Sequence, residues 1–419
     1  MSVEITRLKN GIHVLTHAMP QLETAALGIW VRAGSRDEDE PQNGIAHFIE
    51  HMAFKGTSRR TARDIAEEIE AAGGDLNAAT ATETTAYYAR VLKNDWRLAL
   101  DILSDILIDP TFCEDELERE RDVILQEIAA ANDTPDDLVF ELLQQQAFAN
   151  HPLGRPILGT ADHVSAHSSQ CLNGYRAAHY SAERIVVAAA GNIDHRALVA
   201  EAERQMAAFT PAPAPGHSAP AFTAGPSLAE RPLDQTHIAL AFPGVGYHSD
   251  DLYAMQVLSC VLGGGMSSRL FQEVREQRGL CYSVFAHTAA YADCGILSVY
   301  AATAPDKAGE LLDVTGDVIL SMTDRIDEAE VARARAQIKA SLVMSLESAS
   351  GRADQIARQF LALGRVPEVS ALIERIDEVS ARDVRELARR VVTGKAPAFS
   401  AVGSLAGLAP YERIAARFA

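Results

Sequence analysis

The clearest guide to the architecture of this chain is a pair of stretches that repeat one another, Glu116–Ile128 (ELERERDVILQEI) and Glu330–Leu342 (EVARARAQIKASL). The two align at an offset of 330 − 116 = 214 residues, and their apolar positions stay in register. An internal duplication is the simplest explanation for such self-similarity. We therefore expect the chain to consist of two homologous halves in tandem.

The two halves also share the order of their other elements. In the first half, an apolar strand over Thr24–Val31 and helical segments precede a β-rich run over Leu76–Val91, and long helices follow. In the second half, Thr236–Phe242 precedes helices and then the strand-like runs Tyr282–Thr288 and Gly295–Ala302. Hairpin-like strands mixed with helices within each half favour an α+β class over a doubly wound sheet. We expect two domains, each a mostly antiparallel sheet packed with helices.

The boundary between the halves is marked by Phe209–Pro226 (FTPAPAPGHSAPAFTAGP), which is dense in Pro, Ala and Gly. It has neither a helical nor a strand period, as is typical of a linker. A chain of 419 residues is also longer than one ordinary core should hold. We predict an N-terminal domain over residues 1–208, a linker over 209–230 and a C-terminal domain over 231–419.

The charge balance excludes several kinds of partner. Lys and Arg number 38 and Asp and Glu number 57, which leaves a formal net charge of -19. A surface this acidic repels phosphate backbones and anionic lipid, whereas it attracts basic peptides. We therefore expect peptides, and neither nucleic acid nor membranes, among the partners of this chain.

Two further features bear on the compartment. No stretch approaches the roughly 18 apolar residues that span a bilayer, and the N-terminal residues lack the basic and apolar regions of a secretory signal. The five cysteines are scattered without CxxC spacing, which indicates reduced thiols rather than a disulfide framework. We expect a cytoplasmic protein.

A metal site is indicated by the segment His47–His51 (HFIEH). On a helix, residues four apart share one face with about 5–6 Å between Cβ atoms. Two imidazoles at that spacing can both reach one zinc ion at about 2.0–2.1 Å. Glu50 lies on the adjacent part of that face, where it can hydrogen-bond a metal-bound water and act as a general base. Two histidines can also take this spacing by accident, so the interpretation needs a third ligand.

Candidates for the third ligand lie on a helix predicted over Glu114–Ala130. It carries five glutamates: Glu114, Glu116, Glu118, Glu120 and Glu127. Glu120 and Glu127 share one face, but two helical turns rise about 10.5 Å, so they cannot easily bind one ion together. One should bind the metal and the other should orient a histidine. Their counterparts in the second half are Ala334 and Ser341, so only the first half carries these carboxylates.

These residues resemble a known family. The segment Gly44–Thr57 (GIAHFIEHMAFKGT), with its inverted HxxEH, is similar to the insulinase/pitrilysin zinc peptidases, the inverzincins. Subunits related to the β subunit of mitochondrial processing peptidase, and its bacterial relatives, fit best. Three further segments carry the resemblance: Gly73–Val91 (GGDLNAATATETTAYYARV), His151–Thr160 (HPLGRPILGT) and Leu262–Val284 (LGGGMSSRLFQEVREQRGLCYSV). The resemblance thus runs along the whole chain.

The resemblance implies a complete zinc site in the first half. The family's third ligand is a Glu about 75 residues beyond the second histidine, and 127 − 51 = 76 selects Glu127 here. The metal ligands are then His47, His51 and Glu127, with one Zn²⁺ per chain. Glu120 takes the place of the glutamate that supports a ligand from outside the metal's own shell.

The resemblance also implies how substrate is held. Asn77 and Ala78 match an edge strand that pairs with an extended peptide. Arg275 and Tyr282 match a pair of donors that contact the substrate carbonyl. On spacing alone, Arg275 belongs to a solvated helix face and Tyr282 opens a strand. In this family each subunit forms half of a peptidase chamber, which implies a homodimer whose active sites are shared across subunits.

The expected function is that of a zinc metalloendopeptidase, which cleaves short or unfolded peptides with metal-activated water and Glu50 as the base. One alternative is a processing-type subunit that needs a different partner for activity. Another is a non-catalytic subunit of a larger core, which the intact set His47, Glu50, His51 and Glu127 argues against. The run Gly263–Gly265 lacks a following GK[ST] and a long glycine-rich insertion, so we expect neither a phosphate site nor mitochondrial-type presequence recognition.

Overall fold

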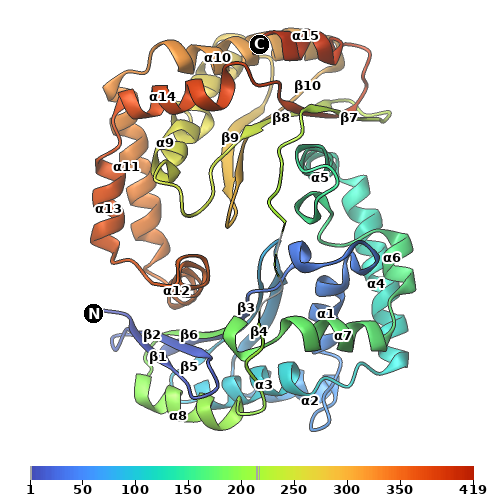
Figure 1. The fold of residues 1–419 in the computed structure, drawn as a ribbon, viewed down its shortest axis with the longest axis vertical. Helices are drawn as coiled ribbons and strands as arrows, with labels where there is room; N and C mark the ends of the chain where they lie inside the picture. The colour runs from blue at the N-terminus through green and yellow to red at the C-terminus, as the bar shows by residue number, and fades with distance from the viewer. Residues whose placement is uncertain (1, 214–215, 217) are drawn as a thin grey trace. The chain divides into compact units, whose positions relative to one another are not determined.

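Residues 2–213, 216 and 218–419 are described by the structure, a computed structural model of the chain. They form two units, each built around its own β-sheet (Figure 1). The first unit comprises residues 1–129, 155–218 and 343–367, and the second comprises residues 130–154, 219–342 and 368–419. The predicted α+β architecture with two homologous domains is confirmed.

The first unit contains a six-stranded sheet in the order β1-β2-β6-β3-β5-β4. Its strands are β1 (Glu4–Arg7), β2 (His13–Ala18), β3 (Thr24–Val31), β4 (Asp75–Thr80), β5 (Thr85–Leu92) and β6 (Ile185–Gly191). All neighbours pair antiparallel except β2 and β6, which are parallel. The β-rich run predicted over Leu76–Val91 forms β4 and β5, and β4, which contains Asn77 and Ala78, lies at the edge of the sheet.

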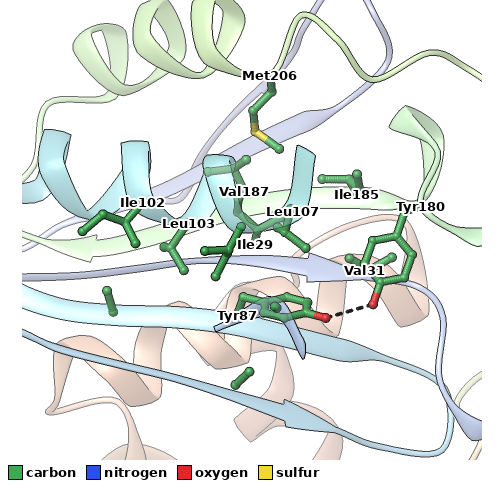
Figure 2. Packing of buried hydrophobic residues seen from close by; sticks show 14 of the residues in the cluster. Ile29, Val31, Tyr87, Ile102, Leu103, Leu107, Tyr180, Ile185, Val187 and Met206 are labelled. Carbon is green, nitrogen blue, oxygen red and sulfur yellow. Dashed lines mark hydrogen bonds between the residues drawn. The ribbon is translucent and has the colours of Figure 1, made fainter. Parts of the chain in front are cut away.

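The central strands β3 and β6 are buried on both faces of this sheet. Successive side chains of a strand point to opposite sides, so neighbouring residues enter different cores. Ile29 and Val31 of β3 pack with Leu103 of α3 (Trp96–Ile108), as Figure 2 shows. Trp30 points the other way and packs against α12 (Ala349–Leu363).

The remaining helices of the first unit lie around the same core. They are α1 (Ile45–Ala53), α2 (Ala62–Ala71), α4 (Glu114–Asp133), α6 (Ala161–Ala166), α7 (Ser169–His179) and α8 (His195–Gln205). The helix α1 contains His47 and His51, and α4 matches the range Glu114–Ala130 expected from the sequence to within a few residues. The hydroxyl groups of Tyr87 and Tyr180 form a hydrogen bond of 3.0 Å inside this core (Figure 2).

The second unit contains a five-stranded sheet in the order β7-β11-β8-β10-β9. Its strands are β7 (Gly225–Glu230), β8 (Thr236–Pro243), β9 (Ser283–Ala290), β10 (Gly295–Thr303) and β11 (Ala398–Gly403). Its helices are α5 (Pro135–Ala147), α9 (Leu252–Gly263), α10 (Ala308–Asp324), α11 (Glu328–Ser345), α13 (Val369–Asp377), α14 (Ala381–Val392) and α15 (Tyr411–Ala416). Only β7 and β11 pair in parallel, which repeats the pattern of the first sheet.

The two halves exchange one helix each. The helix α5 comes from the first half of the sequence but packs against β8 and β11 of the second unit. Conversely, α12 comes from the second half and packs against β3 and β6 of the first unit (Figure 1). Their first residues, Pro135 and Ala349, are again 349 − 135 = 214 residues apart. The exchange therefore follows the same repeat that the sequence shows.

The units consequently differ from the predicted contiguous ranges 1–208 and 231–419 by one exchanged segment in each direction. The predicted linker over 209–230 includes β7, and its residues 214, 215 and 217 lie outside the described part of the chain. Among the described residues, none of the helices combines the length and the apolar character needed to cross a membrane.

Candidate metal centre

The beginning of α1 is held by a carboxylate from outside the helix. Gly44 precedes α1 with a φ of 88°, and a Cβ there would lie 2.7 Å from the carbonyl oxygen of Leu158. The backbone N–H groups of Gly44 and Ala46 each donate to the Glu38 carboxylate at 2.9 Å. The first N–H groups of a helix have no partner within the helix, and the carboxyl oxygens of Glu38 supply acceptors for two of them. Burial raises the pKa of Glu38 to about 8.

The segment Arg155–Thr160, part of the HPLGRPILGT match, packs against this same helix start. Asn43 donates from Nδ2 to the carbonyl oxygen of Pro156 at 2.9 Å. The guanidinium of Arg155 donates to the backbone carbonyl of Glu38 at 2.7 Å. Sequence reasoning matched this segment to the family but gave it no role, and the structure shows that it fixes the position of α1.

Three of the predicted residues converge. Glu127 Oε2 lies 3.6 Å from His47 Nε2 and 3.5 Å from His51 Nε2. One donor atom from each of the three residues lies within 4.8 Å of the others. A tetrahedral zinc ion with ligands at its usual distances holds its donor atoms about 3.4 Å apart. Two imidazoles and a carboxylate at this spacing therefore fit such an ion, in number, chemistry and distance.

The environment keeps one of these imidazoles neutral. Burial, and then the nearby charge of His51, lower the pKa of His47 to about 4. Neutral imidazole is the form that binds metals. The Glu127 side chain is 41% exposed, against 11% for His47, so the cluster opens to solvent beside α4.

Glu120 contacts the other ring nitrogen of a candidate ligand. Its Oε2 lies 3.0 Å from Nδ1 of His51, and its Oε1 lies 2.6 Å from the ammonium of Lys55. Burial by itself would raise the pKa of Glu120, but hydrogen bonds from Lys55 and His51 hold it below its ordinary value. Lys55 was missed by sequence reasoning, although it stands within the quoted segment Gly44–Thr57.

Glu50 occupies the same helix as the two histidines. Its Oε2 is buried and forms no hydrogen bond with any of the described residues. A carboxylate oxygen without a competing partner is available to accept a proton from a substrate or a water molecule.

The predicted substrate residues lie on β4. The strand pairs with β5 on one side, and no other described strand pairs with its other side. Asn77 is exposed on this edge, whereas Ala78 is buried in the core beneath it. The helix α1 packs against β4, so the open edge lies beside the helix that carries the histidines.

Arg275 and Tyr282 lie together in the second unit. Arg275 belongs to a π-helix, Phe271–Gln277, and its guanidinium carbon lies 4.7 Å from the centre of the Tyr282 ring. The Tyr282 side chain is 79% exposed. The nearby Gly263 ends α9, and a Cβ there would lie 2.2 Å from the backbone nitrogen of Ala286 in β9. Close helix–strand packing therefore explains this glycine.

The class of the protein follows from its matches to two protein-family descriptions. Residues 13–161 match the family described as Insulinase (Peptidase family M16), and residues 168–338 match the family Peptidase M16 inactive domain. The chain belongs to peptidase family M16. The family resemblance inferred from the sequence is thus confirmed.

Relatives along the full length agree with this assignment. The chain is 39% identical to an uncharacterized zinc protease of Rickettsia bellii, with 94% of this chain and 95% of the relative covered. It is 36% identical to an uncharacterized zinc protease of Bacillus subtilis, with 92% and 94% covered. Among solved structures, a protease from Helicobacter pylori has the same fold, with a TM-score of 0.89 at 20% identity over 96% of this chain and 99% of that one.

Proposed function

We propose that this chain is a zinc endopeptidase in which His47, His51 and Glu127 hold one Zn²⁺. The observation that carries the proposal is the convergence of their three donor atoms within 4.8 Å. The names of the relatives, zinc proteases, support the choice of metal. His₂Glu ligation with one open position is also the usual donor set of a zinc peptidase.

The fold alone does not distinguish a peptidase from a non-catalytic subunit. A chain of the structure described as Complex III2 from Candida albicans, Inz-5 bound, shares the fold with a TM-score of 0.86 at 23% identity, so the fold also occurs in a structure that is not described as a protease. The cluster of His47, His51 and Glu127 is what favours peptide hydrolysis here, because an inert scaffold needs no such donors.

The residues of this chain then have distinct tasks. When bound, zinc supplies Lewis-acid polarisation and makes water a stronger nucleophile. Glu50 accepts the proton of the attacking water and passes it to the leaving amine. Arg275 and Tyr282 donate hydrogen bonds to the oxygen on which negative charge develops. Glu120 contacts Nδ1 of His51 and so keeps the ring with its Nε2 beside Glu127, where it would be free to bind the metal.

The substrate that fits this chain is an extended peptide. The open edge of β4 offers backbone groups that pair with any extended segment, so Asn77 and Ala78 demand little of its sequence. The net charge of -19 attracts basic peptides. We assign the chain as a homodimer in which each subunit forms half of the chamber and the sites are shared.

The first test is cleavage of a mixed, unstructured peptide library, followed by mass spectrometry. The purified chain is compared with chelator-stripped protein, zinc-restored protein and the variant Glu50→Gln. We expect cleavage that stops on stripping, returns with zinc and is absent in Glu50→Gln. A folded, zinc-loaded protein that cleaves nothing would favour a subunit that needs a different partner.

Sharing of sites between subunits has its own test. The inactive variants Glu50→Gln and Tyr282→Phe are mixed under conditions in which subunit exchange is demonstrated by mass measurement. If one subunit supplies the base and the other the phenol, the mixture regains part of the activity. Exchange without any recovery would refute the shared site and leave the zinc chemistry untouched.

A further inference from the structure

The ammonium group of Lys55 contacts Glu120, the carboxylate that in turn contacts the candidate metal ligand His51. The Lys55 ammonium lies 2.6 Å from Glu120 Oε1, while Oε2 of the same carboxylate lies 3.0 Å from Nδ1 of His51. The Glu120 side chain is only 9% exposed. Lys55 follows α1 by two residues, and its backbone N–H donates to the carbonyl of Met52, so its backbone is fixed as well. The three side chains thus form a continuous, largely buried chain of contacts.

We propose that Lys55 is a positioning residue for the metal centre, which acts by holding Glu120 against His51. This inference rests on the proposed function, because it concerns the same metal site. The evidence for this role is that the two oxygens of Glu120 have different partners. Lys55 binds Oε1, which leaves Oε2 directed at the imidazole of His51. Without the ammonium, a buried carboxylate loses its counter-charge and is driven to turn towards solvent or other donors.

The position of His51 shows why this orientation matters. Its Nδ1 faces Glu120 at 3.0 Å, and its Nε2 faces Glu127 at 3.5 Å. A neutral imidazole has one proton to share between these two carboxylates. A proton on Nδ1 leaves the lone pair of Nε2 free for a metal, whereas a proton on Nε2 blocks it. By keeping Glu120 in place, Lys55 favours the metal-binding tautomer.

The test measures zinc affinity of the stripped protein by competition with a zinc-binding dye, and needs no peptide cleavage. Loss of a partner that orients a ligand typically weakens metal binding about 10–100-fold, and we expect a loss in that range for Lys55→Met. Lys55→Arg retains the cation and should recover most of the affinity. Lys55→Gln serves in its place should Lys55→Met not fold.

A matched control comes from Lys93, which forms an ion pair with Glu23 at 2.8 Å on the surface of the same unit. The Glu23 side chain is 76% exposed, so Lys93→Met removes the same charge from a solvated pair. We expect its zinc affinity to equal that of the unaltered protein.

A double-mutant cycle with Glu120→Ala separates positioning from a direct effect of charge. If Lys55 acts through Glu120, then Lys55→Met should cost nothing further in the Glu120→Ala background. Undiminished loss in that background, or unchanged or tighter zinc binding in Lys55→Met alone, would overturn the inference. Failure of the unaltered protein to bind zinc would instead refute the proposed function.

Discussion

The helices α4 and α11 occupy equivalent places in the two halves, yet only one of them carries chemistry. Leu117 of α4 and Val331 of α11 are related by the offset of 214 and are both fully buried, so the same face of the helix enters each core. Glu120 and its counterpart Ala334 are also both buried, at 7% and 2% exposure. The two helices therefore share one packing scheme and differ in what they place inside it.

The difference teaches what a polar interior position requires. A buried carboxylate is costly unless charged or hydrogen-bonding partners compensate it. Glu120 has such partners in Lys55 and His51, whereas an alanine at position 334 needs none. The helix α4 thus places a paired carboxylate inside the first unit, whereas α11 packs in the same way and places an apolar side chain there.

The largest effect is expected when the proposed metal ligand on α4 is replaced by the residue at the equivalent position of α11. Glu127→Ser introduces the residue that stands at the equivalent position 341. This variant has only two of the three ligands left. After it is stripped and reloaded with zinc, dialysis should leave it with less than one zinc per chain, and it should no longer cleave peptides. Metal analysis by mass spectrometry measures this. The reciprocal variant Ser341→Glu should keep one zinc per chain, and a second bound zinc would contradict the one-sided assignment of the site.

Glu50→Gln should separate metal binding from proton transfer. The amide keeps the shape of the side chain but cannot accept the proton, so peptide cleavage should fall on the order of 10²–10⁴-fold. Zinc content should stay unchanged, because Glu50 is not among the three converging donors. Cleavage at the original rate by a variant free of contaminating protease would show that another group serves as the base.

Shortening the buried side chains that α4 and α11 have at equivalent positions should lower the stability of the fold and leave the metal site intact. Leu117→Ala removes a fully buried side chain from α4 and should lower the free energy of unfolding by about 2–5 kcal/mol. Val331→Ala at the equivalent place in α11 removes fewer carbon atoms, so its cost should be smaller. Denaturant unfolding measures both. Equal costs would mean that the two cores differ in how far they relax around a cavity.

The smallest expected effect is the pH dependence that His47 contributes to the stability of the first unit. In the metal-free protein, the folded pKa of His47 is about 4 against an ordinary value of 6.5. The unfolded chain therefore binds the proton first, and stability falls as pH drops from 6.5 towards 4. The shift corresponds to on the order of 3 kcal/mol at most. Unfolding curves at several pH values should show this slope, and His47→Gln should flatten it; an unchanged slope would assign it to other groups.

Much of the site was predictable because its signals are local. The spacing of His47, Glu50 and His51 fixes one helical face, and the structure places all three on α1. Spacing left open whether Glu120 or Glu127 is the third ligand, and only the family resemblance selected Glu127. The structure separates the two by contact, since Glu127 faces both Nε2 atoms and Glu120 faces Nδ1 of His51.

The sequence by itself determined the duplication, the α+β class and the face of α1 that carries the histidines, because periodicity within a segment and similarity between two segments can both be read without knowing how the chain packs. Tertiary structure alone decided the exchange of α5 and α12 between the units. It also decided the capping of α1 by Glu38 and the pairing of Lys55 with Glu120. The exchange and the Lys55–Glu120 pair join segments remote in sequence, so they depend on how whole helices pack against a sheet. The Glu38 contact is closer in sequence, but it depends on how the loop before α1 is folded.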